Sequence, residues 1–225
     1  MKNVISFSLW GESPIYWIGA KKNIELAQKF FPGWICRIYI DKKCDIKLIE
    51  SIIAHNVEII LVEQINSFDG MFWRFFASED PEVDIFLSRD CDSRFTNREI
   101  AALNQWISSN KDFHIIRDHP YHSVPILGGL WGSRNGLMRK IGLSNLIKDW
   151  GVFNRKGIDQ DFLGDRVYPL VWDKAFEHSE FNLKFKGETN RFPTLRMNYE
   201  FVGDSFDEND NRHPAYWKII KDFKL

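Results

Sequence analysis

Residues 83–94 read VDIFLSRDCDSR, and this stretch decides the fold class. Its first five residues are mostly apolar and β-branched or aromatic, which is typical of a buried strand. Two aspartates, Asp90 and Asp92, follow with Cys91 between them. If the backbone stays extended, the two carboxylates point to the same side. Since ligands of open α/β sheets bind beyond the carboxyl ends of the strands, the stretch predicts a strand that delivers two acidic groups to a ligand site.

On either side of this stretch the chain alternates between strand and helix patterns. Strands are predicted at residues 4–10, 34–40, 57–62, 113–116 and 126–131, and helices at residues 23–31, 46–53, 96–107, 136–150, 159–167 and 216–223. Thr96 and Glu99 form a capping box at the start of one helix, and Asp45 and Asp159 are expected to cap two others. The alternation predicts a mostly parallel sheet with helices on both faces, followed by an irregular C-terminal part after Pro169. We expect a single domain over residues 1–225.

Composition narrows the class of protein. The chain has 30 Lys and Arg against 31 Asp and Glu, a net charge of −1 that argues against general nucleic-acid binding. No uncharged apolar run approaches the ~18 residues that suggest a membrane span, and residues 4–10 are better explained as a strand than as a signal peptide. Three cysteines without a CxxC spacing favour a reducing compartment. We therefore expect a cytoplasmic protein.

The acidic pair favours metal chemistry. Two carboxylates on one side make a hard-oxygen site suited to Mg²⁺ or Mn²⁺, which typically shares its other positions with water and substrate phosphates. Arg89 and Arg94 are placed to hydrogen-bond an anion. The chain has no glycine-rich phosphate loop, so a nucleotide bound here needs a metal and arginines. The alternative is that both aspartates cap a turn or the next helix.

Several segments together resemble bacterial glycosyltransferases of the GT-A type. They are residues 5–11 (ISFSLWG), 71–75 (MFWRF), 88–94 (SRDCDSR), 114–120 (HIIRDHP) and 126–132 (ILGGLWG). Residues 159–163 (DQDFL) are similar to the Asp-Gln motif of glycogenin-like members. The resemblance spans about residues 4–171 and implies a GT-A-like, Rossmann-like fold. It implies a nucleotide-binding half at residues 1–95 that ends in the Asp-x-Asp motif, and an acceptor-side half at residues 96–225.

The resemblance also implies a function. The enzyme would transfer a sugar from a nucleoside diphosphate sugar, a UDP-sugar being favoured, to a glycan or lipid-linked acceptor in bacterial surface polysaccharide synthesis. The cofactor would be Mn²⁺, with Mg²⁺ as the alternative. Asp90 and Asp92 match the metal and diphosphate motif, and His178 is the candidate for a third metal ligand.

By the same resemblance, the other site residues fall into two groups. Those expected to contact the donor are Trp10, Arg74, Arg89, Asp90, Gly128, Gly129 and Trp131. Those expected near the anomeric carbon or the acceptor hydroxyl are Asp159, Gln160 and Asp161. Trp10, Trp73 and Trp131 are candidates for stacking on the base or the sugar.

Other interpretations remain open at this stage. The same carboxylates suit a metal-dependent nucleotidyltransferase or hydrolase, and the aromatic residues suit a non-catalytic sugar-binding module. The cluster of His114, Asp118, His119 and His122 lacks the HExxH spacing of a zinc site, so we read it as a loop whose Asp118 and His119 contact donor or acceptor. Cys91 lies between two carboxylates, which disfavour a nucleophilic thiolate. Basic and aromatic residues from Tyr216 to Lys224 allow weak peripheral membrane association.

Overall fold

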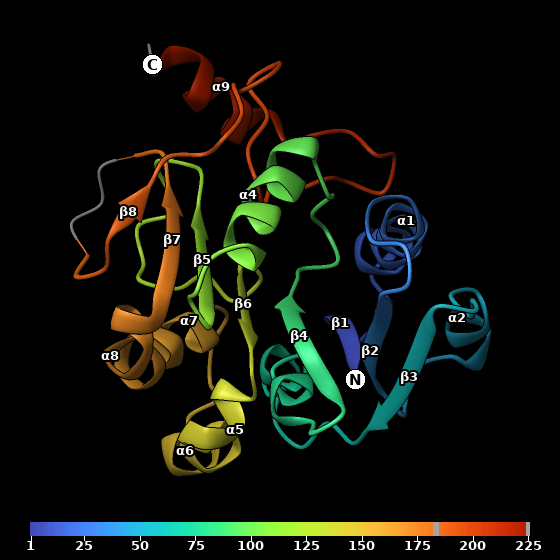
Figure 1. Ribbon diagram of the computed structural model, residues 1–225. Coiled ribbons are helices and arrows are strands. Elements are labelled where there is room, and N and C mark those ends of the chain that lie inside the picture. Colours follow the sequence, from blue (N-terminus) through green and yellow to red (C-terminus); the bar gives the residue numbers. More distant parts are fainter. Residues whose placement is uncertain (182–184, 224–225) are drawn as a thin grey trace.

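The computed structural model describes residues 1–181 and 185–223, which fold around a single mixed sheet (Figure 1). Its strands are β1 (Lys2–Leu9), β2 (Ile35–Asp41), β3 (Val57–Val62), β4 (Val83–Ser88), β5 (Phe113–Arg117), β6 (Trp131–Arg134), β7 (Ala175–Ser179) and β8 (Thr189–Asn190). They lie in the order β3-β2-β1-β4-β6-β5-β7-β8. Every pairing is parallel except those of β6, which runs antiparallel to both β4 and β5. The predicted mostly parallel α/β sheet is confirmed.

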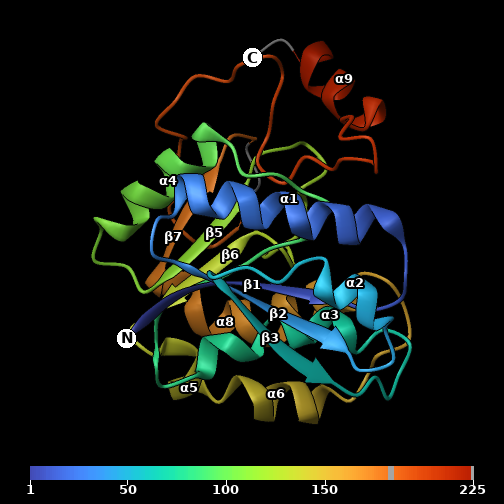
Figure 2. The same ribbon diagram turned by 90° about the vertical axis from the view of Figure 1, so that its right-hand side faces the viewer.

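Helices cover both faces of this sheet, as Figure 2 shows from the side. They are α1 (Pro14–Phe30), α2 (Ile46–Glu50), α3 (Gly70–Trp73), α4 (Asn97–Ile107), α5 (Leu137–Ile141), α6 (Leu143–Trp150), α7 (Ile158–Phe162), α8 (Tyr168–Val171) and α9 (Pro214–Asp222). Helices α1 and α4 lie on one face, and α5, α6 and α8 lie on the other. None of the helices in the described ranges is both long and apolar enough to cross a membrane.

The two layers enclose two hydrophobic cores, because the side chains of a strand alternate between faces. In β1, Val4 packs in the core under α5 and α6, whereas Ile5, Phe7 and Leu9 pack in the core under α1. Burial on both faces explains why these strands read as continuous apolar runs.

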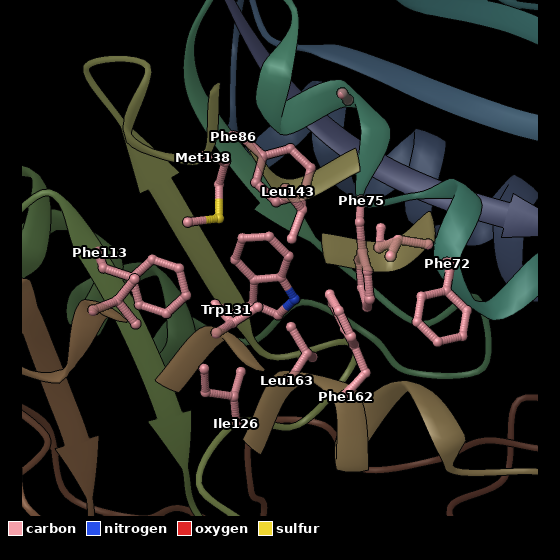
Figure 3. Close-up of a cluster of buried hydrophobic side chains, with 14 of the residues drawn as sticks. Phe72, Phe75, Phe86, Phe113, Ile126, Trp131, Met138, Leu143, Phe162 and Leu163 are labelled. Atoms are coloured by element: carbon pink, nitrogen blue, oxygen red, sulfur yellow. The ribbon is translucent and has the colours of Figure 1, made fainter. Parts of the chain in front are cut away.

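Trp131 lies at the centre of the core under α5 and α6 (Figure 3). Its ring lies 4.8 Å from that of Phe86 and 5.3 Å from those of Phe75 and Phe113, measured between centroids. The predicted strand at residues 126–131 begins only at Trp131, and the residues before it form a loop. Because β6 runs antiparallel, its first residue pairs with Ser88 at the end of β4 and turns its indole into the core.

The observed helices differ from the predicted ones in bounds and continuity, and three differences bear on the site. Helix α1 begins at Pro14, well before the expected residue 23, because proline is favoured at the first helical position. The expected helix over residues 136–150 is divided into α5 and α6 at Gly142, whose φ is 71°. Helix α7 is preceded by Gly157 rather than capped by Asp159. At α4 the Thr96 hydroxyl accepts from the Glu99 amide at 3.1 Å, as predicted.

Asp118 joins the C-terminal segment to the sheet. It follows β5, is fully buried, and accepts hydrogen bonds from Arg98 Nε at 2.8 Å and Arg196 Nη2 at 2.6 Å. The Val202 amide donates to the same carboxylate at 3.0 Å. A buried carboxylate needs such partners because its desolvation is costly. Asp118 is therefore a structural junction between α4, β5 and the C-terminal segment.

Candidate active site

A pocket of about 370 Å³ opens beyond the carboxyl ends of β1 and β4. It is lined by Ser8, Leu9, Trp10, Tyr16, Phe68, Met71, Arg74, Asp90, Cys91, Asp92, Leu127, Gly128, Lys156, Gly157, Asp159 and Gln160. The walls are largely apolar, and five charged side chains converge within them. Such a pocket at the carboxyl edge of an α/β sheet is the expected place for a small-molecule ligand.

Asp90 and Asp92 both lie in this pocket, as the strand-plus-loop pattern suggested. Burial, and then the neighbouring Asp90 carboxylate, raise the pKa of Asp92 to about 6. Two close carboxylates repel each other when both are ionised, and a bound cation would relieve that repulsion. Cys91 between them is buried, and burial raises the pKa of its thiol, which agrees with excluding it as a nucleophile.

Arg74 joins two carboxylates at the floor of the pocket. Its guanidinium pairs with Asp90 through Nη1 and with Asp159 Oδ2 through Nη2 at 3.0 Å. Its backbone amide donates to the Ser8 hydroxyl at 2.9 Å, which fixes the end of α3 against β1. Burial alone lowers the pKa of Arg74, but the Asp90 and Asp159 charges outweigh it, and the net shift is upward. The guanidinium thus stays charged and holds the two acids together.

Asp159 is the most buried charged group of the pocket, with its side chain 1% exposed. Burial raises its pKa, while Arg74 opposes that shift. Its second oxygen, Oδ1, is also buried and has no hydrogen-bond partner within the described part of the chain. An unpaired buried acceptor costs free energy that a hydrogen-bond donor of a ligand can recover.

Gly128 and Gly129 allow these carboxylates to approach the backbone. A Cβ at Gly128 would collide with the Asp159 carboxylate and lie 2.6 Å from Arg74 Nη2. A Cβ at Gly129 would collide with the Asp90 carboxylate. The Ser88 hydroxyl donates to the Gly128 carbonyl at 2.6 Å and fixes the loop. The space left by the absent side chains is therefore filled by the acidic residues of the site itself.

Several residues predicted for the site do not line the pocket. Arg89 is 2% exposed, faces α4, and forms a buried ion pair with Glu99. Trp131 lies in the core described above. Asp161 is partly exposed and pairs with Arg155. Among the predicted donor and catalytic residues, Trp10, Arg74, Asp90, Gly128, Asp159 and Gln160 do line the pocket.

His178 is buried between β7 and α4. On β7, its Nε2 donates to Gln105 Oε1 at 3.0 Å, and its Nδ1 accepts from His114 Nε2 at 2.8 Å. Both rings are fully buried, and burial lowers the pKa of each of them. Across residues 1–181 and 185–223, no group of three His, Cys, Asp or Glu side chains is arranged to hold a metal ion. The structure therefore does not bring His178 to Asp90 and Asp92.

The histidine-rich loop after β5 is also structural. His119 is buried, accepts from the Tyr121 amide at 3.0 Å, and donates to the Tyr216 carbonyl of α9 at 3.1 Å. His122 accepts from the Asp118 amide at 3.0 Å. None of these residues lines the pocket, so the loop anchors the C-terminal segment rather than the predicted donor or acceptor.

The two carboxylates still fit a divalent cation. Asp90 and Asp92 offer the hard oxygen donors that Mg²⁺ and Mn²⁺ prefer, and such ions commonly take their remaining ligands from water and substrate phosphates. Burial first, and then the Asp90 carboxylate, raise the pKa of Asp92, and a cation bound at this corner of the pocket would favour the ionised form of both aspartates.

Tyr16 and Lys156 also line the pocket, although the sequence did not single them out. Tyr16 lies in the first turn of α1, a turn that the predicted helix did not include. Lys156 precedes Asp159 by three residues, on the turn that leads into α7. The only signal for Lys156 was its closeness in sequence to the Asp-Gln motif.

No protein-family model and no curated protein matches the sequence. Among solved structures, a glycosyltransferase involved in glycosylation of the major capsid of PBCV-1 is similar, with a TM-score of 0.50 and 17% identity over 80% of this chain and 82% of that one. The glycosyltransferase GlyE of Streptococcus pneumoniae gives 0.55 and 15% identity over 79% of this chain and 45% of that one. The galactosyltransferase LgtC, solved with donor and acceptor sugar analogues, has a TM-score of 0.50 and 14% sequence identity over 78% of this chain and 73% of that one.

At these identities the similarity concerns the fold. The mixed sheet, its helical layers and its pocket at the strand ends agree with the sequence-based expectation. The chain therefore has the Rossmann-like GT-A fold of these glycosyltransferases.

Proposed function

We propose that the chain is a metal-dependent glycosyltransferase. Its donor is a nucleoside diphosphate sugar, with a UDP-sugar as the first candidate. Its acceptor is a glycan or a lipid-linked glycan of bacterial surface polysaccharide synthesis. The proposal depends on one observation: Arg74 forms salt bridges to both Asp90 and Asp159, and these three residues line one pocket with Asp92. A polar floor within apolar walls suits a ligand that combines a base, a diphosphate and a sugar.

Each group of the pocket has a role in this proposal. Asp90 and Asp92 would hold Mn²⁺ or Mg²⁺, and such an ion would supply Lewis-acid stabilisation of negative charge on the diphosphate. Asp159 Oδ1 accepts a hydrogen bond from a hydroxyl of the donor sugar, and Arg74 holds that carboxylate in place. Gln160 lies beside it with an amide that can donate or accept. Trp10 offers an indole face to the base or sugar.

The two halves of the chain divide the work in this proposal. Residues 1–95 supply Trp10, Arg74 and the aspartates for the donor, and residues 96–225 supply Asp159 and Gln160 for the reacting centre. Transfer breaks the bond between the anomeric carbon and the diphosphate oxygen and forms a bond to the acceptor oxygen. A carboxylate near the acceptor takes the proton of its hydroxyl.

Carboxylate substitutions test the metal role. We expect the wild-type protein to be stabilised thermally by Mn²⁺ with one member of a panel of nucleotide sugars, because a bound ligand shifts the folding equilibrium. Asp90→Asn and Asp92→Asn should lower donor hydrolysis or transfer about a hundredfold or more, because removal of a metal ligand costs several kcal/mol in the transition state. Asp84→Asn, on β4 but outside the pocket, is the matched control. Full activity in both site variants would refute the mechanism.

The released product distinguishes this proposal from nucleotidyl transfer by the same carboxylates. Glycosyl transfer releases a nucleoside diphosphate, whereas nucleotidyl transfer releases pyrophosphate. Binding of free oligosaccharide without nucleotide or metal would instead indicate a sugar-binding module.

The proposal includes weak peripheral binding at the inner face of the membrane, where a lipid-linked acceptor resides. Helix α9 exposes Tyr216, Lys218 and Lys221, while Lys224 lies outside the described residues. Basic and aromatic residues on one short helix favour an anionic lipid surface. We expect co-sedimentation with vesicles containing phosphatidylglycerol but not with pure phosphatidylcholine, and the charge reversals Lys218→Glu and Lys221→Glu should abolish it. Failure to sediment with anionic vesicles would remove this part of the proposal.

A further inference from the structure

Lys156 stands on the wall of the pocket, on the turn that leads from α6 into α7. Gly157, which follows it, has a φ of 83° and reverses the chain there. The preceding Arg155 pairs with Asp161 of α7. Of these two neighbouring cations, only Lys156 lines the pocket with Tyr16 and Asp92.

The pocket contains two positively charged side chains, and they differ in how they are paired. Arg74 is already bound to Asp90 and Asp159. Lys156 forms no ion pair with any carboxylate of the described residues, although it lines the same pocket as Asp92 and Tyr16. Its ammonium therefore faces the same space as the acidic pair without being neutralised by it.

Charge balance indicates what Lys156 is placed to bind. The pocket carries three carboxylates, Asp90, Asp92 and Asp159, against the two cations. A divalent cation would bring the net charge of the lining from −1 to +1, and a nucleoside diphosphate sugar, with about two negative charges, would return it to about −1. Since Arg74 is already paired with two carboxylates, Lys156 is the cation of the described lining that remains available to the diphosphate.

We propose that Lys156 binds the diphosphate of the donor and of the released nucleoside diphosphate. This inference rests on the proposed function and adds a phosphate-binding residue to it. The Nζ hydrogens donate to phosphate oxygens that face away from Asp90 and Asp92. When the anomeric bond breaks, its electron pair stays on the diphosphate oxygen, and the diphosphate gains one negative charge. Lys156 keeps its proton throughout and stabilises that charge.

Calorimetric titration of UDP, GDP and CDP in the presence of Mn²⁺ tests this role. We expect Lys156→Met to weaken binding of the preferred diphosphate about tenfold or more, because a charge-assisted hydrogen bond is lost. Lys156→Arg should retain affinity within about threefold of the wild type, since the charge remains. Lys148→Met, an exposed change of the same charge on α6, should bind like the wild type. Binding of the corresponding free nucleoside should be equal in all four proteins.

The outcomes separate this inference from the proposed function. If the wild type binds a diphosphate and Lys156→Met binds it equally well, Lys156 does not contact the phosphates, and the proposed function stands. Equal weakening in Lys156→Met and Lys148→Met would assign the effect to net charge and overturn the inference. A wild type that binds none of the three diphosphates would overturn the proposed function and the inference with it.

Discussion

At the scale of single residues, the tightest constraint on the candidate site is the absence of a side chain at Gly128. A methyl group there would meet the Asp159 carboxylate and Arg74 Nη2, neither of which can withdraw without breaking their ion pair. Overpacking of this kind typically costs about 1–3 kcal/mol and displaces the groups involved.

Gly128→Ala is therefore expected to lower turnover sharply, about a hundredfold, while the protein remains folded, because small displacements of positioned groups have large effects on rate. The measurement is kcat/KM for donor hydrolysis together with the thermal unfolding midpoint. Gly164→Ala is the control, since a Cβ there meets only Pro125 at an ordinary 3.5 Å. Wild-type kcat/KM in Gly128→Ala would show that catalysis does not depend on the exact positions of Arg74 and Asp159.

At the scale of elements, the buried pair of Arg89 and Glu99 fixes α4 to the loop that carries the acidic pair. Both side chains are 2% exposed, and Arg89 also donates to the Ser88 carbonyl at 2.6 Å. Arg89 turns toward α4, whereas Asp90 lines the pocket; the chain then forms a turn at Cys91 and Asp92, so the extended backbone expected from the sequence does not continue and Cys91 lines the pocket as well. The role of Arg89 is therefore to orient the loop and not to meet the donor.

Removing one partner of this pair should destabilise the protein strongly. Glu99→Leu leaves a buried guanidinium without its counter-charge, which we expect to lower the free energy of unfolding by about 3–5 kcal/mol. The double variant Arg89→Met with Glu99→Leu should recover most of that loss, because an apolar pair needs no counter-charge. Urea denaturation of the single and double variants measures both. Additive losses would indicate that the two side chains are not coupled.

At the scale of the whole molecule, the buried pair His114 and His178 makes stability depend on pH. Burial lowers the pKa of His178 to about 4 and that of His114 well below its ordinary value. Between the ordinary pKa near 6.5 and these values, the unfolded chain binds protons that the folded one excludes, so stability rises with pH. Asp92 and Asp204, whose pKa values burial raises to about 6, act in the opposite direction below that pH.

We expect His178 to account for about 3 kcal/mol of stability lost between pH 6.5 and 4. His178→Gln should therefore show a shallower slope of unfolding free energy against pH across this window, whatever its absolute stability. The measurement is urea denaturation at a series of pH values. An identical slope in the variant would contradict a neutral, buried His178.

The fold and part of the site were predictable because their signals are local. The strand at residues 83–87 and the two aspartates after it are visible in twelve consecutive residues. The ion pair of Arg74 with Asp159 joins positions 85 residues apart, so only the resemblance to a family placed both near a donor. Trp131 was misplaced because nothing local shows that β6 runs antiparallel. His178 was misplaced because its partners, His114 and Gln105, come from other elements.

The junction at Asp118 has a consequence for synthesis of the chain. Arg98 precedes Asp118, but Arg196 and the Val202 amide follow it by about eighty residues. Until the ribosome has added those residues, the Asp118 carboxylate of the nascent chain cannot be buried with its full set of donors. The carboxylate after β5 therefore gains its full set of donors only once residues 196–202 have been made, and a chain truncated before Arg196 would lack two of the three residues that donate to it.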